Sequence, residues 1–240
     1  TTQSDQQDVS YTLGGKRVIS LVPGKSQPSE VIAESKNSLA LSGNLELNTD
    51  LSLKGNLNLE LGGRLNPWLK LQKDTAFATA MLSSAMGKSK ITGVVKGKTD
   101  MDLSSFSFTS ETNSFANEKA GHIFMKLPAV ASGSDSWHMT ELLSKRAEPL
   151  EIPFAINESY DIFITLPEGM IMVSPEVKLT MNNEFGSIDM SVTPNGNQLH
   201  IIREINILKT FVPVEKYDTF KMLINSWNNK KYREIVLKKG

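Results

Sequence analysis

Cysteine is absent from this chain of 240 residues. Its absence excludes disulfide bonds, thiolate metal sites and cysteine nucleophiles. An excess of either charge is also lacking, because 26 lysines and arginines balance 26 aspartates and glutamates. Nucleic-acid-binding proteins normally carry a basic excess, so we expect no nucleic-acid partner. The apolar runs are only a few residues long, well short of the roughly 20 that cross a bilayer, and we expect no membrane span.

Histidine is scarce, with only His122, His138 and His200. None of them has a second histidine two to four positions away, as a pair of metal ligands would need. His122 and His200 fall in strand-like patterns, which favours packed rings that each make one hydrogen bond. A Ser-His-Asp triad could still assemble in space, but no Gly-x-Ser-x-Gly motif supports one.

Two segments resemble part of a phosphate-binding loop, but neither has the glycine spacing of that loop. Gly87–Ser89 lacks a glycine five positions earlier, where Leu82 stands, and Gly93–Thr99 is one residue short. The loop works because its backbone N–H groups surround a phosphate at a helix N-terminus. We therefore predict no cofactor and no metal site, and in the absence of any catalytic motif we predict that this chain is not an enzyme.

Aromatic residues suggest a different kind of site, because an exposed ring can stack on a sugar. Trp227 lies on the apolar stripe of an expected helix, which favours core packing. Trp137 stands among Ser134, Asp135, Ser136 and His138. We therefore expect Trp137 to be the exposed indole and the candidate binding residue.

The most regular feature of the chain is a ladder of leucines at odd positions. Its members are Leu39, Leu41, Leu45, Leu47, Leu51, Leu53, Leu57, Leu59 and Leu61. A period of two places them on one face of extended chain, as in half-buried antiparallel strands. The segment 41–47 is repeated in similar form at 53–59, and we expect Gly43 and Gly55 to lie at bulges or bends.

Helix signals occur once in each half of the chain. Asn66 is a good N-cap, Pro67 suits the first helical position, and Gly87 can end the helix, so we predict one over 66–86. In the second half an apolar stripe predicts a helix over 214–229, followed by a short final strand.

Alternating apolar residues dominate the rest of the second half. They predict four strands in an antiparallel meander, with a hairpin at Asn195–Gly196. The predicted fold class is therefore α+β, mainly antiparallel β. We expect a disordered polar lead-in at 1–10 and two β-rich lobes, 11–132 and 133–240, each with one principal helix. The polar start without methionine suggests a mature or truncated piece of a longer protein.

Several turns and strands in the second half follow one another in a familiar order. They are Arg146–Leu150, Leu166–Gly169, the Asn195–Gly196 hairpin, Leu199–Arg203, the helix that Tyr217 opens, and the final strand Arg233–Lys239. In this order the chain resembles the C-terminal region of bacterial, chiefly Bacteroidetes, transglutaminase-like proteins. The leucine ladder, Gly62–Gly63 and the helix from Asn66 fit the start of that region, so the resemblance spans roughly 11–240.

The resemblance implies a β-rich domain of unknown function that trails a papain-like core in a cell-envelope, periplasmic or secreted protein. Such a core uses a Cys-His-Asp triad, which this chain cannot supply without cysteine. Our first hypothesis is a non-catalytic accessory module that packs against that upstream core or positions its substrate. The alternatives are a glycan- or peptide-binding module and, more remotely, a stand-alone hydrolase.

Overall fold

The computed structural model describes residues 17–19, 28–30 and 37–240, except 75, 138 and 140–141. The expected lead-in at 1–10 lies outside the described residues, as does an apolar segment at 31–33. The strands of the structure are β1 (Arg17–Ile19), β2 (Pro28–Glu30), β3 (Ser38–Leu47), β4 (Leu53–Gly62), β5 (Lys90–Thr99), β6 (Leu103–Thr112), β7 (Ala116–Lys119), β8 (His122–Lys126), β9 (Leu150–Glu151), β10 (Ile156–Thr165), β11 (Met170–Met172), β12 (Val177–Asn183), β13 (Gly186–Asn195), β14 (Gln198–Ile207), β15 (Phe211–Val212) and β16 (Glu234–Lys239). Its helices are η2 (Gly63–Leu65), α1 (Trp68–Lys73), α2 (Phe77–Ala85), η3 (Ser134–Trp137), η4 (Val214–Lys216), α3 (Tyr217–Asn228) and α4 (Lys230–Arg233).

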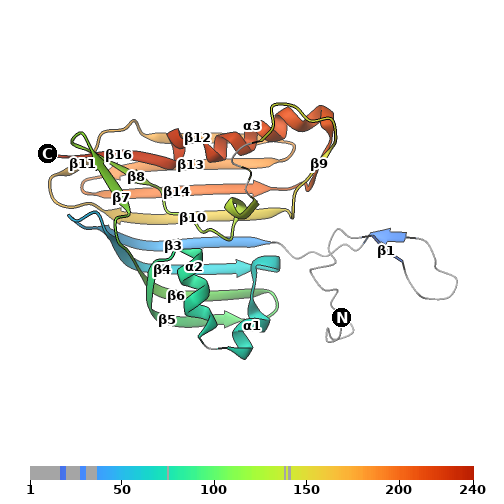
Figure 1. The fold of residues 1–240 in the computed structure, drawn as a ribbon, viewed down its shortest axis with the longest axis horizontal. Coiled ribbons are helices and arrows are strands. Elements are labelled where there is room, and N and C mark those ends of the chain that lie inside the picture. Colours follow the sequence, from blue (N-terminus) through green and yellow to red (C-terminus); the bar gives the residue numbers. More distant parts are fainter. Residues whose placement is uncertain (1–16, 20–27, 31–36, 75, 138, 140–141) are drawn as a thin grey trace.

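Eight strands form the main sheet, in the order β12-β13-β14-β10-β3-β4-β6-β5 (Figure 1). All neighbours in it are antiparallel except β3 and β10, which are parallel. A small sheet of four strands has the order β11-β16-β8-β7. The predicted class, α+β and mainly antiparallel β, is confirmed.

The strands of the two expected lobes lie in one sheet. Ser38–Glu46 of β3 pairs with Asn157–Thr165 of β10, and in the small sheet β8 pairs with β16. The boundary expected at 132–133 therefore crosses shared sheets, because a pairing between such distant segments leaves no local signal in the sequence. Where the chain divides into domains stays a prediction.

The leucine ladder forms the hairpin of β3 and β4, as the alternation predicts. Leu39 faces Leu61 and Leu41 faces Leu59 across the pair, and all four side chains are at most 3% exposed. The register passes through Gly43 and Gly55 without a shift, so neither glycine is a bulge. Glycine is needed at position 55 because the neighbouring strand leaves no room for a side chain. A Cβ at Gly55 would lie 2.1 Å from the Asn44 carbonyl oxygen.

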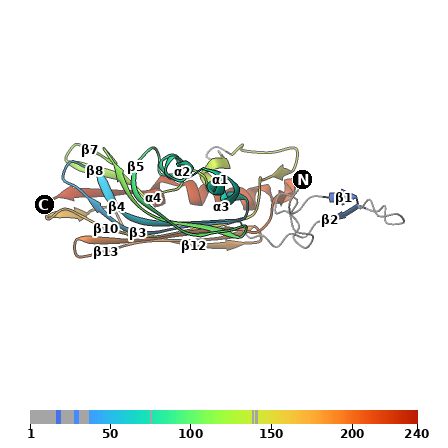
Figure 2. The ribbon, with the colours of Figure 1, turned by 90° about the horizontal axis from the view of Figure 1, so that it is seen from below.

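One face of the main sheet is covered and the other is open. The helices and the small sheet lie on the same side of the main sheet (Figure 2). Side chains toward this layer are apolar and buried, as in the alternating burial of β10 and β14. Side chains on the open face are mostly serine, threonine, asparagine and charged residues, the usual division of a one-sided antiparallel sheet.

The four C-terminal strands are antiparallel, but their order is not the meander that the sequence predicts. A meander would place β12 beside β10, whereas β10 pairs with β14 and β12 lies at the edge. The segment between β10 and β12 contains β11, which pairs with β16 in the small sheet. The chain thus leaves the main sheet after β10 and re-enters it at the far edge.

The helix predicted over 66–86 is divided into α1 and α2. Asp74 is extended, and its side-chain Oδ1 accepts a hydrogen bond from the Ala76 backbone N–H at 2.8 Å. Such a local bond competes with helical hydrogen bonding, which explains the break. At the predicted start of the helix, Asn66 Oδ1 accepts a hydrogen bond from the Trp68 backbone N–H at 3.1 Å. At its predicted end, Gly87 has a φ of 68°.

The C-terminal helix and the final strand are confirmed as α3 and β16. The predicted stripe of α3, namely Tyr217, Phe220, Ile224 and Trp227, is at most 3% exposed. The stripe packs above β12 and β13, so α3 closes the C-terminal half of the core.

Replacing Gly55 by alanine is expected to lower the free energy of unfolding by about 1–3 kcal/mol, the usual cost of overpacking. The added Cβ would collide with the Asn44 carbonyl of the neighbouring strand. Urea denaturation measures the effect. Ser42→Ala, on the open side of the partner strand β3, is the control and should stay within about 0.5 kcal/mol of wild type. Equal stability of both variants would show that β3 and β4 do not approach this closely.

Candidate functional site

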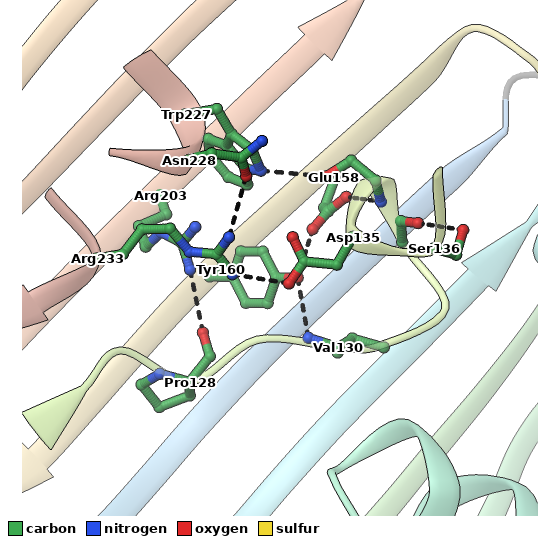
Figure 3. Close-up of polar contacts among 12 residues, drawn as sticks. Pro128, Val130, Asp135, Ser136, Glu158, Tyr160, Arg203, Trp227, Asn228 and Arg233 are labelled. Carbon is green, nitrogen blue, oxygen red and sulfur yellow. Dashed lines mark hydrogen bonds and ion pairs between the residues drawn. The ribbon is translucent and has the colours of Figure 1, made fainter. Parts of the chain in front are cut away.

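The most polar part of the core is a group of side chains between the main sheet and the layer that covers it (Figure 3). We call it the buried cluster and define it by Ser134, Asp135, Glu158, Tyr160, Arg203, Trp227 and Arg233. Glu158 and Arg203 are each only 1% exposed. Burying a charged group lowers the stability of the fold unless the group is paired or hydrogen-bonded. We therefore expect both side chains to have such contacts.

Strand alternation places the cluster's charges in the core. Glu158 and Tyr160 share the inward face of β10 with Ile162. Arg203 lies inward on β14 and is the register partner of Tyr160. Neither Glu158 nor Arg203 was expected from the sequence, although both stand at apolar positions of an alternating pattern. A charge at such a position is the signal that could have identified them.

Glu158 and Tyr160 bind the segment that leads from β8 to η3. The Tyr160 hydroxyl donates to Glu158 Oε1 at 2.5 Å and accepts from the Val130 N–H at 3.1 Å. The second carboxylate oxygen, Oε2, accepts from the Ser134 N–H at 2.6 Å. A Cβ at Gly133 would lie 2.5 Å from this oxygen, so the segment approaches the carboxylate as closely as its backbone allows.

Arg203 is held mainly by aromatic rings. Its guanidinium carbon lies 4.4 Å from the centroid of the Trp227 ring and 5.2 Å from that of Tyr160, which is cation–π geometry. Nη1 donates to the Pro128 carbonyl at 3.2 Å. Nε and Nη2 have no hydrogen-bond partner among the residues that the structure describes. The two rings and the nearby carboxylate therefore stabilise this cation.

Burial changes how two of these groups titrate. Loss of solvent raises the pKa of Tyr160 well above its ordinary value, and the negative charge of Glu158 raises it further. Loss of solvent also lowers the pKa of Arg203, and the negative charge of Glu158 opposes this effect. Tyr160 is thus a neutral phenol at neutral pH, and it acts as a hydrogen-bond donor to the carboxylate.

The helical layer is joined to the same cluster. Trp227 Nε1 donates to the Ser134 hydroxyl oxygen at 3.1 Å, and Arg233 forms an ion pair with Asp135 at 2.7 Å. Arg233 also donates to the Asn228 side chain at 3.0 Å. Strands β10 and β14, helix α3 and the segment from Pro128 to η3 therefore share one network.

Trp137, the candidate binding residue, is half-buried rather than exposed. Its ring packs edge-on against Phe154, with the centroids 5.5 Å apart. Its Nε1 is buried without a hydrogen-bond partner in the described part of the chain. The polar neighbours in the sequence suggested exposure, but the turn at η3 directs the indole toward Phe154. A binding role for Trp137 stays a prediction.

The described histidines lie away from the cluster. His200 lies on the open face of β14. Its Nε2 is 2.8 Å from Asp161 Oδ1, and its ring stacks on the ring of Phe163 with the centroids 4.1 Å apart. This matches the packed ring with one hydrogen bond that the sequence predicts. His122 is exposed rather than packed, and its Nδ1 lies 3.1 Å from the Ala120 carbonyl oxygen. Within the described ranges neither ring bonds to a serine hydroxyl, and His138 lies outside them.

A groove of about 760 Å3 lies beside α1 and α2. We call it the α1–α2 groove; it is lined by Leu61, Arg64, Leu65, Asn66, Pro67, Trp68, Leu69, Lys70, Phe77, Ala80, Met81, Ser84, Ala85, Ala131 and Ser132. The volume falls in the range of ligand pockets. Most of the lining is apolar, so the groove suits an apolar partner better than a polar substrate.

The part of the chain that the structure describes lacks two further features. It contains no group of three or more His, Asp or Glu side chains placed to hold a metal ion. None of its helices has both the length and the apolar character needed to span a membrane.

The fold defines an α+β chain with a one-sided main sheet, and its second half matches a known family. Residues 122–237 match the family described as a Domain of Unknown Function with solved-structure structure (DUF3858). The match begins at β8 and ends in β16, and it includes the whole buried cluster. No curated protein matches the chain.

One solved structure is similar over part of the chain. It is described as a "putative protease" from Parabacteroides distasonis ATCC 8503, with 31% sequence identity and a TM-score of 0.47. The similar region covers 50% of this chain and 24% of the other. The matched region is thus about a quarter of the length of that protein.

Replacing Glu158 by glutamine is expected to destabilise the protein by about 3 kcal/mol. The amide would turn an N–H toward the Ser134 N–H or the Tyr160 hydroxyl, and Arg203 would lose its buried negative neighbour. Urea denaturation measures the change. Asp189→Asn, at an exposed position of β13, removes a carboxylate charge without these contacts and is expected to be nearly neutral. If both variants lowered the stability of the protein by a similarly small amount, the hydrogen-bond network around Glu158 would be contradicted.

Proposed function

We propose that this chain is a non-catalytic accessory module of a larger transglutaminase-like or protease protein, in which it packs against a catalytic domain or positions its substrate. The observation that carries the proposal is the buried cluster. Its carboxylate, phenol and guanidinium are bonded to backbone and rings of the same fold. These groups give rigidity to the module, because their hydrogen-bonding atoms are directed inward rather than toward a substrate.

Two findings from the sequence support the same proposal. The match of 122–237 is to a domain of unknown function, and the order of turns and strands resembles the trailing region of transglutaminase-like proteins. A chain without cysteine would leave the nucleophile to the upstream core. We place the whole protein in the periplasm or cell envelope, or among secreted proteins, as the resemblance implies.

The test combines this chain with the catalytic domain encoded upstream of it, expressed separately. We expect calorimetric titration to detect association and the melting temperature of the catalytic domain to rise, since a partner that binds only the folded state stabilises it. Hydrolysis or transamidation of a peptide substrate by the catalytic domain should also change. No association together with unchanged stability and activity would overturn the proposal.

A second candidate function, glycan binding, is favoured by the open face of the main sheet. A row of polar and aromatic side chains crosses five strands there, in register: His200, Phe163, Asn44, Asn56 and Thr109. Amide and hydroxyl groups both donate and accept hydrogen bonds, as sugar hydroxyls do, and the Phe163 ring stacked on His200 offers an apolar platform.

If the row binds glycans, Phe163→Ala should weaken binding about tenfold, equivalent to 1.4 kcal/mol. A glycan array with the wild-type chain identifies a ligand, and titration of that ligand compares the variants. Trp137→Ala tests the residue that the sequence singled out. Met222→Ala on α3, 60% exposed, is the control. An array without binding, or equal affinity of the Phe163 variant, would remove this candidate.

A further inference from the structure

The α1–α2 groove has apolar side chains that the rest of the described chain does not cover. Leu69 is 52% exposed, and Trp68, Phe77 and Met81 are half-buried. All four line the groove. Aromatic residues and methionine are enriched where proteins contact one another, and a contiguous exposed apolar surface commonly marks an interaction site.

Both charged residues among the described residues that line the groove are basic. Arg64 and Lys70 line it, and Lys70 Nζ lies 5.6 Å from the centroid of the Phe77 ring. Nearby, Lys96 Nζ donates to the Leu71 carbonyl at 3.5 Å. None of the described residues that line the groove is acidic. An occupant with an apolar body and acidic flanking groups would complement this surface.

The chain enters the main sheet beside the same groove. Asn37, immediately before β3, accepts a hydrogen bond from the Arg64 N–H at 2.8 Å and donates to the Ala155 carbonyl at 2.9 Å. In Figure 1, β3 begins at the end of the sheet where α1 lies. A domain joined to the N-terminal side of Asn37 is therefore tethered to the end of the sheet where α1 lies. Such a connection raises the effective concentration of the two partners.

We propose that the α1–α2 groove is the docking site for the catalytic domain that precedes this chain, and that it receives an apolar segment of that domain flanked by acidic residues. This inference rests on the proposed accessory function and names the surface through which it acts. Leu69 and Met81 supply the apolar contact, and Lys70 selects for the acidic flank.

The first experiment measures the affinity of the separately expressed catalytic domain for variants of the groove. Leu69→Asp and Lys70→Glu should each weaken binding about tenfold or more, since one introduces a charge into the apolar contact and the other repels the acidic flank. Both side chains are exposed, so the fold should be retained, which circular dichroism checks.

Matched controls carry the same changes elsewhere on the surface. They are Val95→Asp on β5, at a position 63% exposed, and Lys88→Glu in the turn after α2. Both should bind as wild type does. If the catalytic domain binds all four variants equally, the groove is not its docking site, while the accessory function stands.

The second experiment tests the groove without the catalytic domain. The dye 8-anilino-1-naphthalenesulfonate, an apolar anion, should fluoresce with this chain and less with Leu69→Asp or Lys70→Glu, and the catalytic domain should displace it. If the dye binds the groove but the catalytic domain neither associates nor displaces it, both the docking proposal and the accessory function fall. Displacement by oleate alone would assign the groove to a lipid instead and overturn the proposal.

Discussion

Ser38–Glu46 of β3 and Asn157–Thr165 of β10 lie side by side in parallel, at the middle of an otherwise antiparallel sheet. The chain between them must make an excursion that ends on the free side of β3. The excursion includes β4 to β6 on one side of the pairing and β7, β8 and η3 in the covering layer. The buried cluster is assembled on the inward face of β10 by the last part of this excursion, so the pairing positions both the sheet and the cluster.

Local patterns predicted the elements well where one face of an element is apolar. The leucine ladder and the stripe of α3 are examples, because burial of one face fixes both the type and the orientation of an element. The helix over 66–86 was predicted as one piece because the apolar pattern continues through Asp74, whose side-chain bond to Ala76 competes with the helix. The order of the strands was not predictable. The position of β10 between β14 and β3 depends on contacts between segments that are distant in the sequence.

The candidate site was harder to predict than the fold. Strand alternation placed Glu158 and Arg203 inward, but the partners that stabilise them are the backbone of Pro128 and Ser134 and the rings of Tyr160 and Trp227. These come from three separate parts of the chain. Trp137 shows the converse, since polar neighbours in the sequence did not predict its packing against Phe154.

The family match begins at residue 122, after β3 and β4 have already been formed. A protein cut at that point would keep β10 but lose the strand that covers its free side. The backbone N–H and C=O groups of β10 that face β3 would then have no partner in the same molecule, and an unprotected sheet edge readily pairs with another copy. The N-terminal half therefore pairs with the edge of β10 that the matched half alone would leave open, which gives the leucine ladder a purpose beyond filling the core.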